Sequence, residues 1–573
     1  MDFIKSQEEK IKEVLNKIGY KVDYVKLNVS NMPELGDYQF NGVMPLAKEY
    51  HKNPREIAQE LVDNLDKEDF EKISVDGPGF INIKFSNAAL VNYFKDYTLK
   101  EYDKNNKTIV LDYGSPNVAK ALHVGHLRSA NIGEALKRLA TFLGYNTISD
   151  NYLGDWGRPM GLVMLELKNK NPEWPFFDEN YTGEYPEVEI TNEELEYLYP
   201  IASAKAKEDE TYLEEAREMT ARLQRKERGI YALWEKIIEV SKANIKRLYD
   251  KLNVEYDEEY GEAYSDNFVN DVVEYYKNNN LTRLSEGALV VDVAKEDDKK
   301  ELPPAILVKS NGTVSYETTD LATIYDRVNR HNPTAIWYVV DNRQDLHFDL
   351  VFRTAKKGIL KDKDVKLEFL GFGTMNGKDG KPFKTRDGGV MTLESLMDQV
   401  KEETAKKINE NYDESLKEEI AQKLSIAALK YADLLPVRTT DYIFDIEKFC
   451  DLNGKTGVYL LYSIVRAKSL LNKASDINDS LIKINGLQDR DVLVKLLQVD
   501  STLNKAFEER SLSFITDYLY QLSKSYNSFY DANKVLIESD EELKKSWIYI
   551  TRKFVEVAST LTNILAIDIP NKM

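Results

Sequence analysis

Residues 107 to 129 read KTIVLDYGSPNVAKALHVGHLRS and combine a strand, a turn and the start of a helix. The apolar, β-branched run Thr108 to Tyr113 predicts a short buried strand, and the Gly-Ser-Pro-Asn stretch after it predicts a turn. From Gly125 to Leu143, apolar side chains recur at helical spacing, and Gly144 is typical of the position after a helix. A strand, a phosphate-facing turn and a helix N-terminus predict a doubly wound, parallel-sheet α/β domain of the nucleotide-binding (Rossmann-like) type.

The His123-Val-Gly-His126 motif lies where this turn becomes the helix. Gly125 lets a nucleotide approach the backbone, and a helix N-terminus favours a phosphate. Two imidazoles can donate hydrogen bonds to phosphoryl oxygens as charge develops during nucleotidyl transfer. The alternative is that His123 and His126 only cap the helix, since short motifs often occur by chance.

The surrounding chain divides into regions of different character. Helical spacing over 5–17 and 54–65 and an alternating strand over 78–85 predict a small α+β domain before the motif. Strands return at 288–293, 305–309, 336–340 and 366–371. Helices are predicted at 394–410, 415–435, 455–474, 488–499, 502–526 and 541–565, so we expect the C-terminal domain to be all-α.

Taken over the whole chain, the net charge of −19 argues against a nucleic-acid partner, but this charge is distributed unevenly. Residues 173–218 contain 15 acidic and three basic side chains, and residues 255–275 contain eight acidic and none basic. These two segments account for the whole excess, whereas residues 451–573 are neutral overall, with 16 charges of each sign. The mostly helical, acidic stretch interrupts the α/β pattern and reads as an insertion at about 170–285.

Composition narrows the class of protein further. The single cysteine, Cys450, excludes a disulfide framework and multi-cysteine metal sites. There is no apolar run long enough to span a membrane and no signal-like start. We therefore expect a cytoplasmic protein with no membrane partner.

The longer string SPNVAKALHVGHLRS and the YLGDWG segment (Tyr152 to Gly157) resemble the class I aminoacyl-tRNA synthetases, and within them the arginyl-tRNA synthetases. Other segments similar to that family occur in the right order: GDYQFNGVMPLAK, NPREIAQEL, GPGFINI, YETTDLA, RQDLH, GKPFKTRDGG, KYADL, RTTDYIFD and AIDIPNKM. The resemblance implies an N-terminal tRNA-contacting domain (1–105), a class I catalytic domain (106–393), a helical connector (394–450) and a helical anticodon-binding domain (451–573).

The resemblance also assigns the arginine site. A guanidinium is planar and always charged, so its pocket should supply carboxylates. By resemblance, Asp112 and Asp320 lie beside the substrate guanidinium with Tyr316 nearby, while Asn117 and Gln344 contact the α-amino end. For Asp320 alone, the competing interpretation is the N-cap of the following helix.

The ATP site has one departure from the class signature. The second class I signature is usually Lys-Met-Ser-Lys, but here Pro382-Phe383-Lys384-Thr385 takes its place. The resemblance makes His123, His126, Lys120 and Lys384 the catalytic, phosphate-stabilising residues, with Lys120 offered as a replacement for the missing charge. It adds ATP contacts at Ser115, Gly125, His126, His347, Lys381 and Arg386. The alternative is that this loop is an ordinary solvated hairpin, which would contain lysines and glycines too.

The remaining expected contacts are with tRNA. Tyr38, Gln39 and Asn41 form an aromatic–polar cluster that can bind an unstacked base. The alternative is that the aromatic side chains belong to the core of the domain. Tyr459 and Arg466 share a helix face and are expected at the anticodon stem, or else the tyrosine packs between helices.

The implied activity is an arginine–tRNA ligase that uses ATP. Arginine is activated to arginyl-adenylate, and the arginyl group passes to the 3′-terminal ribose of tRNA-Arg, in this family typically with tRNA needed for activation too. We expect Mg²⁺ only with ATP, no protein-bound metal, and a monomer. The alternatives are a class I synthetase for another amino acid and a non-catalytic tRNA-binding paralogue. The altered second signature leaves the paralogue open, whereas the intact HVGH motif and Lys120 argue against it.

Overall fold

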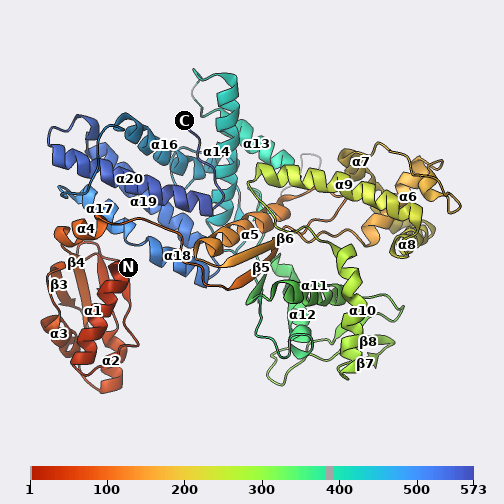
Figure 1. The fold of residues 1–573 in the computed structure, drawn as a ribbon, viewed down its shortest axis with the longest axis horizontal. Coiled ribbons are helices and arrows are strands. Elements are labelled where there is room, and N and C mark those ends of the chain that lie inside the picture. The colour runs from red at the N-terminus through yellow and green to blue at the C-terminus, as the bar shows by residue number, and fades with distance from the viewer. Residues whose placement is uncertain (1–2, 382–390, 409) are drawn as a thin grey trace.

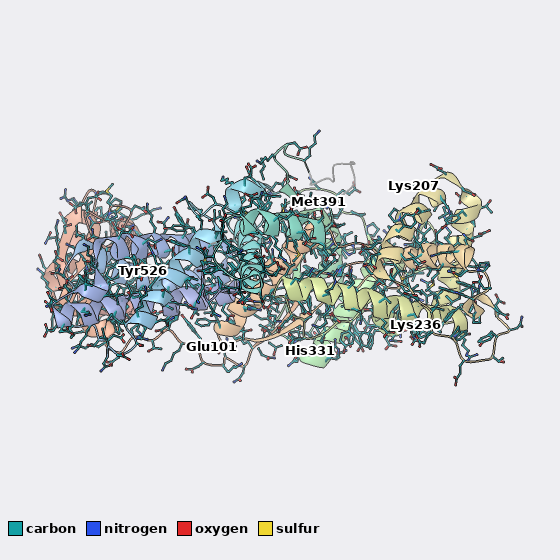
Figure 2. The ribbon with its side chains drawn as sticks, turned by 90° about the horizontal axis from the view of Figure 1, so that it is seen from above. Glu101, Lys207, Lys236, His331, Met391 and Tyr526 are labelled. Atoms are coloured by element: carbon teal, nitrogen blue, oxygen red, sulfur yellow. The ribbon has the colours of Figure 1, made fainter. Side chains whose placement is uncertain are left out.

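The computed structural model describes residues 3–381, 391–408 and 410–573. It is elongated, with the N-terminal domain and C-terminal helices at one end and the inserted helices at the other (Figure 1). Seen from above, Tyr526 and Lys207 mark these two ends, and Met391 lies between them (Figure 2).

The N-terminal domain packs helices on a four-stranded antiparallel sheet in the order β1-β2-β4-β3. Its strands are β1 (Leu27–Val29), β2 (Tyr38–Phe40), β3 (Phe70–Asp76) and β4 (Phe80–Phe85). Its helices are α1 (Phe3–Lys17), α2 (Val43–Tyr50), α3 (Pro54–Asn64) and α4 (Asn87–Phe94). Asn53 caps α3 ahead of Pro54, and Phe40 and Phe85 are fully buried. The predicted α+β domain is confirmed.

A four-stranded parallel sheet, in the order β11-β10-β5-β6, forms the centre of the molecule. Its strands are β5 (Thr108–Tyr113), β6 (Asn146–Asp150), β10 (Ala335–Val339) and β11 (Lys366–Phe369). Helices α5 (Val124–Phe142) and α11 (Tyr316–His331) lie on opposite sides of it, and α12 (Asp345–Lys357) lies on the α11 side (Figure 1). The predicted Rossmann-like fold is confirmed.

The strands near residues 288 and 305 do not belong to this parallel sheet. They form a separate antiparallel sheet, which consists of β7 (Arg283–Ser285), β8 (Ala288–Val291) and β9 (Ala305–Val308). Their apolar content did not distinguish a small sheet from a central one, because both bury β-branched residues.

The insertion is helical, as the sequence predicts. It follows α6 (Arg158–Lys170) and contains η1 (Pro175–Phe177), α7 (Asn192–Glu208), α8 (Glu210–Gln224), α9 (Arg228–Lys251) and α10 (Glu262–Asn278). Helix α9 runs from this outer lobe back toward the central sheet (Figure 1).

After the short strand β12 (Met375–Asn376), nearly the whole chain is helical. The elements are α13 (Leu393–Ala405), α14 (Glu414–Leu434), β13 (Tyr442–Ile443), α15 (Ile446–Phe449), α16 (Gly457–Lys473), α17 (Leu487–Leu496), α18 (Val499–Glu508), α19 (Ser513–Ala532), η3 (Val535–Ile537) and α20 (Glu541–Ile564). The predicted helix 502–526 is instead two helices. Arg510 breaks it by adopting a left-handed backbone with φ of +50°, while its side chain binds Glu368 and stacks on Trp337.

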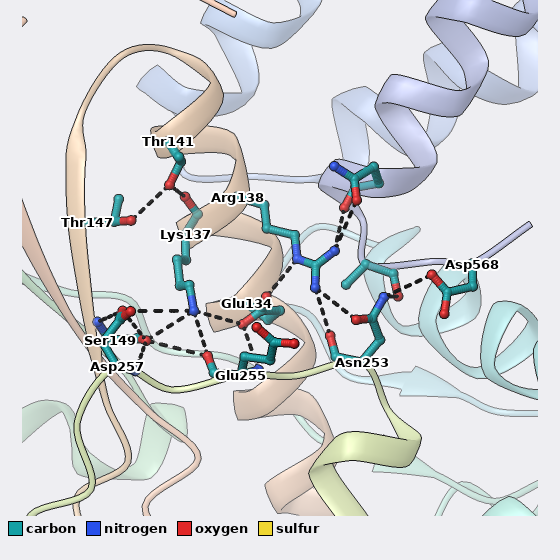
Figure 3. A network of polar contacts seen from close by, with 12 residues as sticks. Glu134, Lys137, Arg138, Thr141, Thr147, Ser149, Asn253, Glu255, Asp257 and Asp568 are labelled. Carbon is teal, nitrogen blue, oxygen red and sulfur yellow. Dashed lines mark hydrogen bonds and ion pairs between the residues drawn. The ribbon is translucent and has the colours of Figure 1, made fainter. Parts of the chain in front are cut away.

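The far half of α5 is fixed to the rest of the chain by a polar network (Figure 3). Arg138 binds Glu134 on its own helix, Asn253 after α9, and Asn563 near the end of α20. The α/β domain, the insertion and the C-terminal helices therefore meet on one helix. No helix in the described part of the chain is long and apolar enough to cross a bilayer.

Candidate active site

The candidate site lies beyond the carboxyl ends of β5 and β10. The chain passes from β5 through α5 to β6 on one side, and later through α11 to β10 on the other side of β5. The crossover direction therefore reverses between β5 and β10, and open α/β sheets bind ligands at such a switch point. Asn117 follows β5 and Gln344 follows β10, so the sheet brings both to this edge.

His123 and His126 cap helix α5 at this edge. The backbone N–H of Gly125 donates to Nδ1 of His123, and the backbone N–H of His123 donates to Nδ1 of His126, both at 3.0 Å. The centres of the two imidazole rings are 4.0 Å apart. A Cβ on residue 125 would lie 2.8 Å from Cε1 of His123, so glycine is needed for this arrangement.

Capping leaves both histidines able to act on a ligand. Because each Nδ1 accepts a backbone N–H, the proton of a neutral imidazole lies on Nε2. Burial, the other imidazole and Lys120 lower the pKa of His126 to about 3, and burial, Arg343 and Lys120 also lower the pKa of His123. At neutral pH the pair therefore presents two uncharged Nε2–H donors at a helix N-terminus, which is a site for phosphoryl oxygens.

The loop between β5 and α5 has a constrained backbone. Ser115 and Ala119 adopt left-handed conformations with φ of +43° and +59°, which L-residues rarely do. Asn117 is exposed and bridges to Gly154 of the YLGDWG segment, where a Cβ would come within 2.5 Å of its side-chain oxygen. The two segments of the family signature thus form one wall of the site.

Asp112 is bound to a guanidinium of the chain itself. Its Oδ2 accepts from Nη2 of Arg327 at 2.7 Å, Asp150 accepts from the same nitrogen at 2.6 Å, and the Ser115 hydroxyl donates to Oδ1 of Asp112. Burial raises the pKa of Asp112, and Arg327 opposes that rise. In the structure Asp112 orients Ser115 and Arg327, and its expected place beside the substrate guanidinium stays a prediction.

Asp320 is not a helix N-cap. Ser315 caps α11, and Asp320 lies in the helix's second turn with its carboxylate hydrogen-bonded to Nε2 of His347 on α12. Burial disfavours the charged form of His347, but this bond and the charge of Asp320 outweigh it and raise its pKa. His347 therefore orients Asp320 in the structure.

Two further carboxylates face the same region and were missed from sequence. Burial and the negative charges of Asp155 and Asp320 raise the pKa of Glu262, the first residue of α10, to about 7. Burial also raises the pKa of Asp155, in the YLGDWG segment, to about 6. A burial-driven shift beside other carboxylates marks a functional-site candidate. The sequence showed Glu262 only as one of eight acidic residues in 255–275.

Three other predicted ligand residues, Tyr316, Gln344 and Lys381, are exposed. Tyr316 is 64% exposed at the start of α11, within electrostatic range of Glu262 and Arg158. Gln344 is exposed, and the neighbouring Arg343 acts on His123. Lys381 is exposed, whereas Lys384 and Arg386 lie outside the described residues.

The residues expected to contact tRNA are only partly open. Tyr38 is 2% exposed and belongs to the hydrophobic core, so its ring offers no face to a base. Gln39 is half-buried and donates to Asn82, and Asn41 is half-buried beside it.

On α16, Tyr459 and Arg466 both point to α19. The Tyr459 hydroxyl accepts from Asn527, and Arg466 bonds Asn527 and lies 4.1 Å from the Tyr530 ring. The interpretation that the tyrosine packs between helices therefore describes this structure.

Comparison with known proteins covers the whole chain. Residues 5–85 match the family described as arginyl tRNA synthetase N terminal domain, residues 88–446 the catalytic domain of tRNA synthetases class I (R), and residues 460–573 the DALR anticodon binding domain. The chain is 45% identical over 576 residues to an arginine–tRNA ligase of Alkaliphilus oremlandii, covering 98% of each. It is 43% identical to that of Agathobacter rectalis, covering 99% of this chain and 98% of the other.

Solved structures agree in fold. Arginyl-tRNA synthetase from Plasmodium falciparum superposes with a TM-score of 0.82 at 24% identity, covering 100% of this chain and 99% of the other. The Thermus thermophilus enzyme gives 0.80 at 20% identity, with 100% of both chains covered. The chain belongs to the arginyl-tRNA synthetase family of class I aminoacyl-tRNA synthetases.

Proposed function

We propose that this protein activates L-arginine with ATP and transfers the arginyl group to the 3′-terminal ribose of tRNA-Arg. The observation that carries the proposal is the pairing of two sites at one sheet edge. The carboxylate cluster of Glu262, Asp155 and Asp320 suits a guanidinium, and the neutral His123–His126 pair on α5 suits phosphates.

The arginine site divides between charge and polar contacts. Glu262 and Asp320 pair with the guanidinium, with Tyr316 at the entrance. Asn117 and Gln344, which follow adjacent strands, hold the α-amino end. Asp112 lies beside the guanidinium as well, with Ser115 and Arg327 holding its carboxylate.

The reaction needs no covalent intermediate on the protein. The arginine carboxylate attacks the α-phosphorus of ATP, the bond to the β-phosphate oxygen breaks, and pyrophosphate leaves. A terminal ribose hydroxyl of tRNA then attacks the carbonyl of the adenylate and AMP leaves. His123, His126 and Lys120 stabilise phosphate charge, joined by Lys384 and Arg386 and by the Mg²⁺ that class I synthetases usually use with ATP.

The tRNA extends from this site to the C-terminal helices. The N-terminal domain contacts the tRNA corner through Gln39 and Asn41. Residues 451–573 bind the anticodon side, with Tyr462, 42% exposed, and Arg466 on the contact face.

The test is arginine-dependent exchange of pyrophosphate into ATP, with and without tRNA-Arg. We expect exchange only with arginine and only when tRNA is present, and charging of tRNA-Arg. Equal activity with lysine or glutamine would exclude the proposed specificity, and binding of tRNA without any exchange would favour a non-catalytic paralogue.

A further inference from the structure

The acidic insertion reaches into the candidate active site at the loop that carries Lys120. Ala119, directly before Lys120, has the left-handed backbone described above, and its N–H donates to the Ser241 hydroxyl at 3.3 Å. Ser241 is on α9 of the insertion and is 1% exposed. The end of the Ser115–Lys120 loop is therefore held from outside the parallel sheet.

A second contact holds the lysine side chain itself. The Lys120 Nζ lies 4.4 Å from the centre of the Tyr199 ring, on helix α7 of the insertion. An ammonium this close to an aromatic ring is attracted by the negative potential of the ring face, and the ring takes no proton from it.

Helix α7 offers the ring from a fixed position. Leu195 and Leu198, which precede Tyr199 on α7, are buried, and the Lys205 ammonium binds Glu166 of α6 at 2.9 Å. Tyr199 is itself half-buried against two hydrophobic clusters.

The charge of Lys120 acts on both proposed parts of the site. Its charge lowers the pKa values of His123 and His126 and opposes the raised pKa of Glu262. The ammonium thus lies within electrostatic range of both the proposed phosphate site and the proposed guanidinium site. In the proposed reaction, the arginine carboxylate meets the α-phosphate between these two sites.

We propose that Tyr199 is a positioning residue that holds the Lys120 ammonium for the activation step, so that the acidic insertion completes the ATP site. This inference rests on the proposed function. Lys120 touches the substrates, and Tyr199 acts through Lys120.

The test compares Tyr199→Leu with Tyr199→Phe and with Tyr197→Leu. Tyr197 is on the same helix but is 70% exposed, so its replacement controls for changes to α7. We expect Tyr199→Leu to lower kcat/KM for ATP in tRNA-dependent exchange by about 2- to 30-fold, the range of a cation–π contact. The KM for arginine and the melting temperature should match those of Tyr197→Leu. Tyr199→Phe keeps the ring face and should retain near wild-type kinetics.

A double-mutant cycle with Lys120→Ala decides whether the ring acts through the lysine. In that background Tyr199→Leu should cause no further loss of kcat/KM for ATP. The same loss with and without Lys120, equal kinetics of Tyr199→Leu and Tyr197→Leu, or a Tyr199→Phe defect as large as that of Tyr199→Leu would each overturn the inference. Failure of the wild-type protein to activate arginine would instead overturn the proposed function.

Discussion

The Arg128 guanidinium and the Asp433 carboxylate form an ion pair of 2.8 Å, with the two side chains 1% and 0% exposed. Arg128 is on α5, two residues after His126, and Asp433 is near the end of α14. Arg128 also donates to the carbonyl oxygen of Gly373 at 2.6 Å, and the Tyr442 hydroxyl donates to Asp433 at 3.0 Å. One buried pair thus joins the histidine helix, the segment ahead of the second signature and the helical region.

Replacing Asp433 with alanine should destabilise the protein strongly. Arg128 would stay buried without a counter-charge, and breaking such a pair costs about 3–5 kcal/mol. Urea-induced unfolding should show that loss in the free energy of unfolding, with a smaller loss for Asp433→Asn, which keeps a hydrogen-bond acceptor.

The exposed pair Arg217–Glu210 provides the control, because its side chains are 54% and 76% exposed. Glu210→Ala should change the free energy of unfolding by less than about 1 kcal/mol. Equal effects of Asp433→Ala and Glu210→Ala would mean that burial does not govern the Arg128–Asp433 pair.

The fold could be read from sequence wherever local signals agreed with tertiary packing. Thr108–Tyr113 is mostly apolar because it is buried on both sides of the sheet, and its bounds match the predicted ones. The break at Arg510 had no such signal. It depends on contacts with Glu368 and Trp337, about 140 and 170 residues away in sequence, and neither glycine nor proline marks it.

Only part of the candidate site could be predicted from the sequence, for a similar reason. The His123–His126 motif is local, so its capping geometry follows from spacing. The pairing of Asp112 with Arg327 and the raised pKa of Glu262 depend on residues that meet only in the folded chain. The resemblance places Asp112 beside the substrate guanidinium, but only the folded chain shows that Arg327 holds it.

Removing the second imidazole should slow activation without weakening tRNA binding. His126→Ala loses one preorganised Nε2–H donor, and loss of such a donor costs on the order of 10²-fold in kcat. Exchange kinetics and filter binding of tRNA check the two parts. An unchanged exchange rate would remove His126 from phosphate stabilisation.

The depressed pKa of His126 also predicts an acid effect on stability. The group has a pKa of about 3 in the fold and roughly 6.5 when unfolded, so the unfolded chain binds the extra proton between these values. Its contribution to stability is present above about pH 6.5 and is lost as the pH falls toward 3. His126→Asn, which does not titrate, should therefore lose less stability than wild type between pH 7 and pH 5. Parallel stability curves for the two proteins would contradict the assignment.

Arginine binding should weaken as the pH falls through 7. Burial and neighbouring carboxylates give Glu262 a pKa of about 7, and only its ionised form pairs with the substrate guanidinium. The KM for arginine in exchange should therefore rise between pH 8 and pH 6. Glu262→Gln should raise that KM at pH 8 and flatten its pH dependence, and Asp320→Asn should raise it strongly as well.

The raised pKa of Glu262 also lowers the stability of the protein when no arginine is bound. The folded carboxyl holds its proton up to about pH 7 and the unfolded one only up to about 4.5, so Glu262 lowers stability progressively as the pH rises through this window. Arginine supplies the missing counter-charge, so the rise in melting temperature that it causes should grow from pH 6 to pH 8. A KM and a thermal shift independent of pH would place the guanidinium elsewhere.

The acidic charge of the insertion should lie off the tRNA path. Helix α8 is in the outer lobe, at the opposite end of the molecule from α16 and α19 (Figure 1). Its Glu214 and Glu218 are 61% and 62% exposed, and repulsion of phosphates by exposed charges is screened beyond about 8 Å at physiological ionic strength. Replacing both with glutamine should leave the KM for tRNA within about two-fold of wild type at every salt concentration.

Asp531→Asn provides the contrast, because Asp531 lies 3.3 Å from Arg466 on the proposed contact face. Its loss frees positive charge for phosphates and should lower the KM for tRNA, most of all at low salt. Tighter tRNA binding by the α8 variant than by Asp531→Asn would show that the tRNA passes along the insertion instead.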